Sequence, residues 1–79
     1  MNDTIQVKFF GPLLDIMGKE NLQCPFIENT DLLKEYLFAS YPALEKTSFS
    51  IAINQQIISS NTALEVGQTI AFLPPFSGG

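Results

Sequence analysis

The segment TDLLKEYLFASYP, residues 30–42, decides which fold this sequence adopts. Thr30 is a favourable N-cap residue, and Asp31 places a negative charge in the first turn, where it complements the helix dipole. Apolar side chains recur at every fourth position, at Leu33, Leu37 and Tyr41. Pro42 cannot continue a helix because it lacks the backbone N–H and clashes with the preceding turn. The segment therefore predicts one amphipathic helix of about eleven residues, capped by Thr30 and ended by Pro42.

Segments on both sides of this helix alternate between apolar and polar residues, which is typical of half-buried strands. We expect strands at residues 4–10, 21–26, 49–53 and 69–73, with a further short strand that contains Ile57 and Ile58. Asn54-Gln55 would form the tight turn into that short strand. Between the first two strands, Leu13–Met17 predicts a short helical segment closed by Gly18 in a left-handed conformation.

The order of these elements predicts an α+β fold in a single domain, residues 1–79. One main helix packed across a mixed, curved sheet of roughly four to five strands is the simplest way to bury the apolar faces. The first and last strands would pair in parallel at the centre of that sheet. A hydrophobic content of 46% supports one core and argues against disorder.

Charge and residue types exclude several classes of function. The net charge is −4 and only four residues are basic, so no binding to nucleic acid or to an anionic membrane is expected. The sequence has no histidine and a single cysteine, Cys24, which we expect to be buried and structural. No metal site, bound cofactor or catalytic side-chain cluster is predicted. No stretch is long enough to span a bilayer, and the expected location is the cytoplasm.

The second functional signal is a set of apolar residues on the solvent side of the predicted strands. The alternation points Phe10, Ile57 and Leu73 away from the core. If their strands are neighbours, the three side chains form one exposed apolar patch. Small monomers seldom expose such a patch without a partner to cover it. The sequence therefore predicts a protein interface on the open face of the sheet.

The sequence closes with PPFSGG, residues 74–79, which we call the tail. Pro74 and Pro75 lack backbone donors and stop the preceding strand, so they would form a stiff collar. Gly78 and Gly79 carry no Cβ atoms, and a strip of glycine backbone can enter a channel too narrow for any other residue. We expect a protruding tail whose terminal carboxylate, on Gly79, is the reacting group. Phe76 would extend the apolar interface along the tail.

Four segments carry a resemblance to a known family. They are VKFF at residues 7–10, the helix at residues 30–41 with Pro42, AINQ at residues 52–55 and IAFLPPFSGG at residues 70–79. Together they resemble the small subunits of molybdopterin synthase, the ubiquitin-like sulfur carriers of molybdenum-cofactor biosynthesis. The resemblance covers essentially the whole chain, and the strand followed by Pro-Pro, two residues and Gly-Gly is its most specific part.

The resemblance implies a β-grasp fold and a sulfur-carrier cycle. A ubiquitin-activating-type adenylyltransferase would use ATP to adenylate the Gly79 carboxylate, and a sulfur donor would displace AMP to leave a thiocarboxylate. The tail would enter the large synthase subunit, with Gly78 allowing passage, and pass its sulfur to cyclic pyranopterin monophosphate. The chain would be a non-catalytic subunit of a heterotetramer and bind no cofactor of its own. The partner-binding residues would be Phe10, Ile57, Leu73, Pro74, Pro75 and Phe76.

Two departures and three alternatives accompany this resemblance. Leu14-Asp15 stands where the family often has an Arg-Glu pair, and residues 66–68 replace its usual Asp-Gly-Asp turn. The alternatives are a sulfur carrier for thiamine or tRNA thiolation, a ubiquitin-like modifier joined to lysines through Gly79, and an interaction module with an inert tail. The Pro-Pro collar and the chain length favour the pterin pathway.

Overall fold

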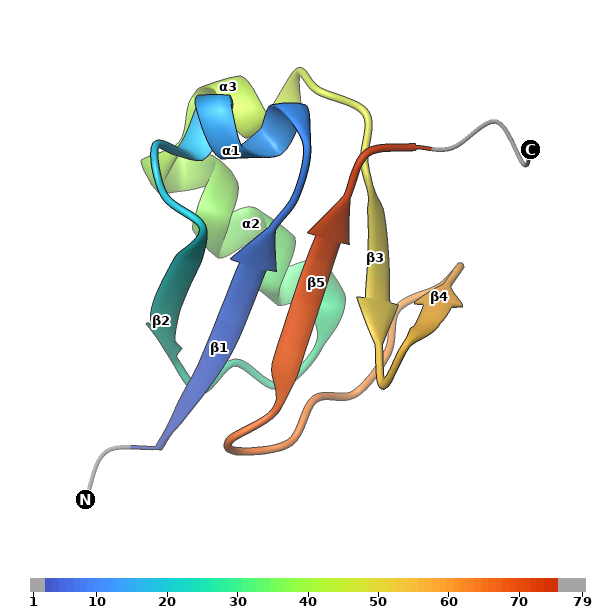
Figure 1. Ribbon diagram of the computed structural model, residues 1–79. Coiled ribbons are helices and arrows are strands. Elements are labelled where there is room, and N and C mark those ends of the chain that lie inside the picture. The colour runs from blue at the N-terminus through green and yellow to red at the C-terminus, as the bar shows by residue number, and fades with distance from the viewer. Residues whose placement is uncertain (1–2, 76–79) are drawn as a thin grey trace.

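The computed structural model describes residues 3–75, and within them five strands form one mixed sheet. The longest helix crosses one face of this sheet, and two short helices lie towards the end where the first and last strands finish (Figure 1). The strands are β1 Thr4–Phe9, β2 Asn21–Pro25, β3 Ser50–Ile53, β4 Gln56–Ile58 and β5 Thr69–Leu73. The helices are α1 Pro12–Met17, α2 Thr30–Ser40 and α3 Pro42–Glu45. The predicted α+β architecture, with one main helix across a mixed sheet, is confirmed.

The last strand lies at the centre of the sheet. The strand order is β2-β1-β5-β3-β4, with β5 parallel to β1 and antiparallel to β3 (Figure 1). Val7 pairs with Ile70, and Phe9 pairs with Phe72. The predicted parallel pairing of the first and last strands is therefore confirmed. Because successive side chains of a strand point to opposite faces, these pairs direct one row of side chains towards the helices and the next row away from them.

The core lies between the helices and the inner face of the sheet. Phe9 and Phe72 are fully buried, as are Leu33 and Leu37 of α2. The ring centroids of Phe9 and Phe72 lie 5.6 Å apart, and those of Phe49 and Phe72 lie 5.0 Å apart. Aromatic pairs at these separations add to the stabilisation from burial alone. The inward positions predicted from the alternation of β1 and β5 are all buried.

The start of α2 differs from the prediction by one residue. Asn29, and not Thr30, is the N-cap, and its side-chain oxygen accepts a hydrogen bond from the Leu32 amide at 3.0 Å. Thr30 is buried at 2% exposure. Both residue types can cap a helix, so the sequence pattern alone could not separate them. Thr30 instead makes contacts with residues that are distant in the sequence, and a local sequence pattern cannot reveal such contacts.

The Asn29 cap gives a stability prediction. We expect Asn29→Ala to lower the free energy of unfolding by about 1 kcal/mol, because the Leu32 amide loses its acceptor. The melting temperature, followed by circular dichroism, should fall by about 4–8 °C for a domain of this size. Asn29→Asp keeps the acceptor and should melt close to the unsubstituted protein. Equal losses in both variants would show that the cap is not the source of the effect.

The remaining predicted elements are present with small changes at their ends. Gly18 ends α1 in the left-handed conformation, and Asn54 and Gln55 both have positive φ in the turn between β3 and β4. Phe10, Phe26 and Phe49 lie just outside the strands that were predicted to contain them. Tyr41 ends α2, and the helix α3, which was not predicted, buries Leu44 beneath it. Among residues 3–75, no helix is long and apolar enough to cross a membrane.

Candidate functional site

The sheet face opposite the helices, here called the outer face, carries a row of four paired residues. Lys8 of β1 pairs with Ala71 of β5, Ala71 pairs with Ala52 of β3, and Ala52 pairs with Ile57 of β4. Ile57 is 60% exposed at the edge of the sheet. The two alanines in the middle leave the centre of the outer face low, between taller side chains on either side.

Phe10 and Leu73 form the neighbouring row. Both follow directly after the paired residues Phe9 and Phe72 of the parallel ladder, and the Phe10 amide donates to the Phe72 carbonyl oxygen at 3.2 Å. Phe10 is 41% exposed, and Leu73 is half-buried. The structure therefore brings Phe10 and Leu73 together. Ile57 lies apart from them, because β3 separates β4 from β5.

A hollow of about 560 Å³ lies on the outer face, over the two alanines of the first row. Its floor and upper wall include Ala71, Ala52, Lys8 and Phe10. The lower wall comes from the β3–β4 turn and from the residues that lead into β5, namely Asn54, Gln55, Gly67, Gln68 and Thr69. The hollow thus opens on the same face as the apolar residues that the sequence predicts to bind a partner, and Phe10 is one of the residues that line it.

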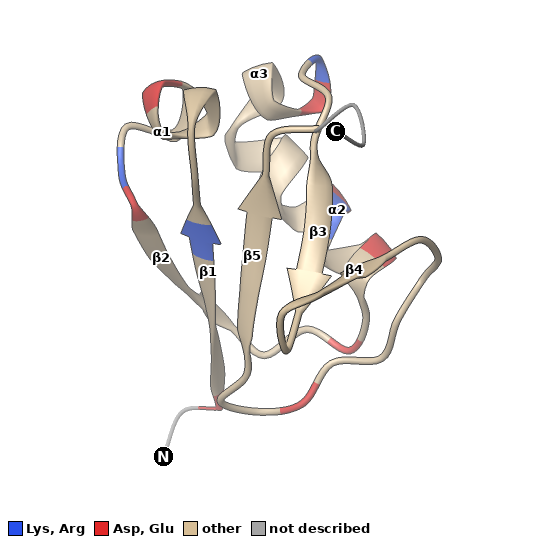
Figure 2. Ribbon diagram, turned by 45° about the vertical axis from the view of Figure 1, so that its right-hand side comes forward, with Lys and Arg blue, Asp and Glu red and all other residues tan. Residues whose placement is uncertain are grey.

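The outer face is nearly free of charge although the protein is acidic. Of all residues in the five strands within residues 3–75, Lys8 alone is charged. Figure 2 shows this as one blue band on β1 in an otherwise tan sheet, while the acidic residues lie in the helices and connections around it. An uncharged face with a single cation differs from the ordinary mixed surface of a small domain and is typical of the central part of an interface.

The base of the tail is packed against the start of α1. Gly11 has a φ of 59°, and a Cβ atom there would lie only 3.0 Å from Pro74 Cγ. Pro74 is half-buried and Pro75 is exposed. The tail therefore starts directly beyond β5, beside Phe10 and Leu73. Phe76, Gly78 and Gly79 lie outside the described residues, so their predicted roles stay predictions.

Side-chain chemistry is sparse in the described part of the chain. Within residues 3–75, no group of three or more Cys, Asp or Glu side chains is placed to hold a metal ion. Cys24 is 1% exposed, and burial raises the pKa of its thiol, which disfavours the reactive thiolate. The expectation that Cys24 is buried is confirmed, and its environment suits a structural role.

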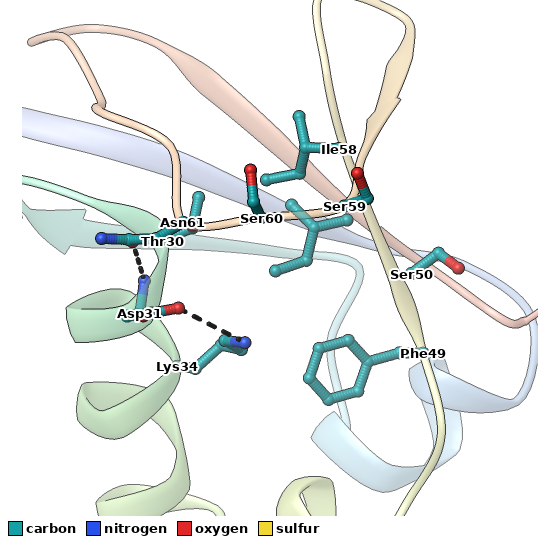
Figure 3. A pocket seen from close by; sticks show the side chains of 10 residues that line it. Thr30, Asp31, Lys34, Phe49, Ser50, Ile58, Ser59, Ser60 and Asn61 are labelled. Carbon is teal, nitrogen blue, oxygen red and sulfur yellow. Dashed lines mark hydrogen bonds and ion pairs between the residues drawn. The ribbon is translucent and has the colours of Figure 1, made fainter.

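A second cavity, of about 310 Å³, lies between α2 and the β3–β4 region (Figure 3). Asp31 and Lys34 line it from α2, Phe49 and Ser50 from the start of β3, and Ser59 from the connection after β4. The Lys34 ammonium is 3.6 Å from an Asp31 carboxylate oxygen. Figure 3 shows this ion pair on the wall opposite the Phe49 ring. Such an exposed pair contributes little to stability.

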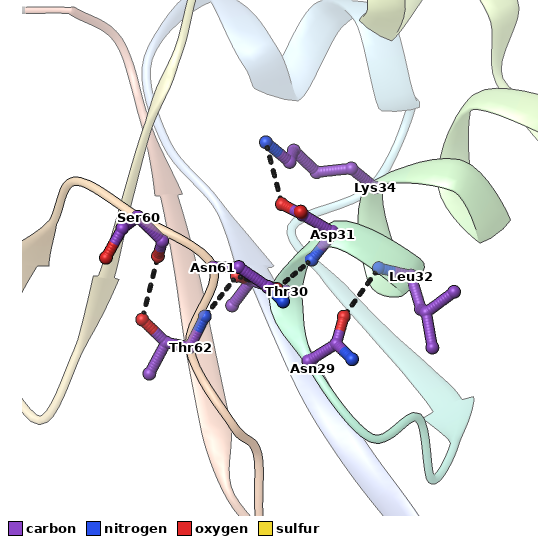
Figure 4. Close-up of polar contacts among 8 residues, drawn as sticks. All are labelled: Asn29, Thr30, Asp31, Leu32, Lys34, Ser60, Asn61 and Thr62. Atoms are coloured by element: carbon purple, nitrogen blue, oxygen red, sulfur yellow. Dashed lines mark hydrogen bonds and ion pairs between the residues drawn. The ribbon is translucent and has the colours of Figure 1, made fainter.

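The polar groups beside this cavity join the N-terminus of α2 to the connection after β4 (Figure 4). The Asp31 amide donates to Asn61 Oδ1 at 2.9 Å, and the Thr62 amide donates to Thr30 Oγ1 at 3.0 Å. The Thr30 amide donates to the Thr62 carbonyl oxygen at 2.9 Å. Because these first amides of α2 already have acceptors, the helix N-terminus offers no free donors to an anion. We therefore interpret these contacts as structural, because they hold the N-terminus of α2 against the connection after β4.

Sequence reasoning missed three residues that shape the outer face. Ala52 and Ala71 form the floor of the hollow, and Lys8 supplies its charge. All three lie at outward positions of strands, so the alternation contains the signal. The pairing of β3 with β5 was needed to bring the two alanines side by side. Gly11 also shapes the site, because its lack of a side chain accommodates Pro74.

Three curated relatives of this chain share one description. A molybdopterin synthase sulfur carrier subunit of Caenorhabditis elegans is 32% identical over 82 aligned positions, with 96% of this chain and 98% of that protein covered. A protein of the same description from Haemophilus influenzae is 30% identical, with 95% and 99% covered. The alignments therefore extend over essentially the full length of both relatives.

Solved structures agree with these sequence matches. A complex of subunits 1 and 2 of molybdopterin-converting factor from Helicobacter pylori contains a chain that is 29% identical, with a TM-score of 0.71 and 96% and 99% of the two chains covered. Small archaeal modifier protein 1 from Methanosarcina acetivorans is 26% identical, with a TM-score of 0.78 and 100% and 99% covered. Both support the ubiquitin-like β-grasp fold.

The family assignment rests on the match along the whole domain. The family model of the ThiS family matches residues 7–79, from the middle of β1 through the tail. This range includes the outer face, the collar and both terminal glycines. With relatives at 30–32% identity over nearly their full length, the chain belongs to the ThiS family and is a sulfur carrier subunit of the molybdopterin synthase type.

Proposed function

We propose that this protein carries sulfur on the carboxyl group of Gly79 for the synthesis of molybdopterin. The observation that supports this proposal most directly is the path of the chain at the end of the domain. The central strand β5 leads without a loop into Pro74 and Pro75, beside Phe10 and Leu73 on the outer face. A partner that covers this face would therefore also lie next to the start of the tail.

The proposed cycle has three steps. The Gly79 carboxylate attacks the α-phosphorus of ATP on an adenylyltransferase, which releases pyrophosphate and leaves an acyl adenylate. A sulfur donor then displaces AMP, and the product is a terminal thiocarboxylate. In the last step the tail enters the large synthase subunit, where sulfur passes to cyclic pyranopterin monophosphate. Adenylation is required because a carboxylate oxygen is a poor leaving group. The transfer in the last step is favoured because the thiocarboxylate sulfur is a better nucleophile than a carboxylate oxygen.

The division of labour between subunits supports this proposal. Within residues 3–75 the only cysteine is buried, and acidic side chains form no group of three or more that could hold a metal ion. The chemistry would then depend on groups of the partners, and this chain would supply the reacting carboxyl group and the surface that positions it. The H. pylori relative is described as a complex of two subunits, which favours a large subunit as the partner here.

Two measurements test the proposal. Protein purified from its native host should contain, by intact mass spectrometry, a species heavier by the difference between sulfur and oxygen. That species, mixed with the large subunit of the same organism, should convert cyclic pyranopterin monophosphate into molybdopterin. Unmodified protein should not. If the thiocarboxylate forms but no molybdopterin appears, a carrier for another thiolation pathway is the better assignment.

A ubiquitin-like modifier is the second candidate, because the chain is also similar to small archaeal modifier protein 1 over its full length. That function would use the same adenylate but join Gly79 to a lysine amine of another protein. Isopeptide-linked adducts in a tryptic digest of native-host extract would favour it. Their absence, together with molybdopterin formation, would favour the sulfur carrier.

The outer face gives a binding prediction. We expect Phe10→Asp to weaken binding to the large subunit by about 100-fold, since a charge would replace an aromatic anchor beside the tail. Titration calorimetry would measure the change. Leu32→Asp is the matched control, because Leu32 is 42% exposed but lies on α2, on the other side of the protein. Equal weakening in both variants would contradict the assignment of the outer face to the partner.

A further inference from the structure

Within residues 3–75, Lys8 has no anionic partner on the face that it occupies. Its cross-strand neighbours are Asn21 and Ala71, and the outward neighbours along β1 are Gln6 and Phe10. Within residues 3–75 the one ion pair joins Asp31 to Lys34, on α2. Lys8 is exposed and contributes to the wall of the hollow. Among the described residues, its ammonium group is therefore left without a charged partner.

Covering this face would remove that water. An ammonium group that loses its hydration without gaining a hydrogen-bonded anion carries a large penalty. A purely apolar partner surface would fit the two alanines but would leave Lys8 buried without compensation. The partner surface must therefore combine an apolar side chain over the floor of the hollow with a carboxylate beside it.

We propose that the large synthase subunit docks on the outer face with an Asp or Glu side chain paired to Lys8 and a bulky apolar side chain seated on Ala52 and Ala71. This inference rests on the proposed function and adds the chemistry of the docking surface to it. The hollow is continuous with Phe10, which lies at the base of the tail, so docking and tail insertion would use one surface. Lys8 then acts as a specificity-determining residue.

Charge complementarity argues against other occupants. A second copy of this chain would bring no carboxylate from its own strands, which within the described range contain Lys8 as their single charge. It would instead oppose one lysine with another. An overall charge of −4 disfavours a nucleic acid or an anionic membrane. A partner surface that is apolar except for one acidic residue would complement both parts of the hollow. Its apolar part would cover the alanine floor, and its carboxylate would pair with Lys8 in the wall.

The test compares two lysines on opposite sides of the protein. With the large subunit of the same organism, we expect Lys8→Met to raise the Kd by about 10-fold and Lys8→Glu to raise it further, because the proposed carboxylate would then be unpaired or repelled. Lys34→Met changes the net charge equally but lies on α2, and it should leave the Kd within about twofold. Thermal melting of all variants should stay close to that of the unsubstituted protein.

Further variants separate this inference from the proposed function. Ala71→Leu would fill the floor and should weaken binding while leaving melting unchanged, and a partner Asp or Glu changed to Lys should restore binding to Lys8→Glu. Binding that is unchanged in Lys8→Met, or tighter in Lys8→Glu, would overturn the role of Lys8 while sulfur transfer stands. If the unsubstituted protein neither binds the large subunit nor supports molybdopterin formation, both the inference and the proposed function fail.

Discussion

Removal of Gly79 is expected to abolish molybdopterin formation and to leave the fold intact. The reacting carboxyl group would move back by one residue, about 3.5 Å along an extended chain, and would no longer reach its position in the partner. Misplacement by even about 1 Å can cost about 100-fold in rate. The measurement is the yield of molybdopterin from cyclic pyranopterin monophosphate with the large subunit and the activating system supplied.

A variant with one alanine added after Gly79 makes the matched comparison, because it keeps both glycines but shifts the carboxyl group in the other direction. Both variants should fail in sulfur transfer and melt like the unsubstituted protein, since neither change touches residues 3–75. Binding to the large subunit should be largely retained through the outer face. Full activity of either variant would rule out the sulfur-carrier proposal.

Phe72→Ala should have the largest effect on stability. Phe72 is fully buried in the central strand and contacts the rings of Phe9 and Phe49. Truncation of a buried phenylalanine costs about 3–5 kcal/mol, while a domain of this size has a total stability of about 4–12 kcal/mol. We therefore expect a fall in melting temperature of at least about 12 °C, or an unfolded protein, by circular dichroism and calorimetry.

Phe10→Ala is the control for this change. Phe10 follows the pair Phe9–Phe72 by one position and points to the outer face, where it is 41% exposed. Its truncation should cost less than about 1 kcal/mol. The two phenylalanines thus separate stability from partner binding. Similar losses of stability in both variants would mean that the two faces of the sheet had been assigned the wrong way round.

Much of the fold could be predicted because the local patterns agree with the tertiary structure. Alternation in β5 pointed Leu73 away from the core, so the burial of Ile70 and Phe72 follows from it, and the four-residue spacing of Leu33 and Leu37 marked the buried face of α2. Each pattern follows directly from the side-chain repeat of its own strand or helix, so it can be recognised in the local sequence alone. The predicted N-cap was wrong because the Thr30 side chain forms hydrogen bonds with Asn61 and Thr62, which lie in a connection about thirty residues away in the chain.

The candidate site was predictable in part for the same reason. Outward positions follow from alternation, so the exposure of Phe10 and Ile57 was foreseen. Their distance from one another depends on strand order, and local patterns do not determine which strand lies between β5 and β4. The pairing of Ala52 with Ala71, which makes the hollow, likewise arises only from the complete sheet.

The central position of β5 also has a consequence for protein synthesis. Without residues 69–73, β2 and β1 form one pair and β3 and β4 form another, and no described strand joins the two pairs. A chain that the ribosome releases before this strand is made has no continuous sheet and would be exposed to proteolysis. Prematurely terminated copies would therefore be removed before they could occupy the large subunit, and the partner would meet almost only copies that carry the complete final strand.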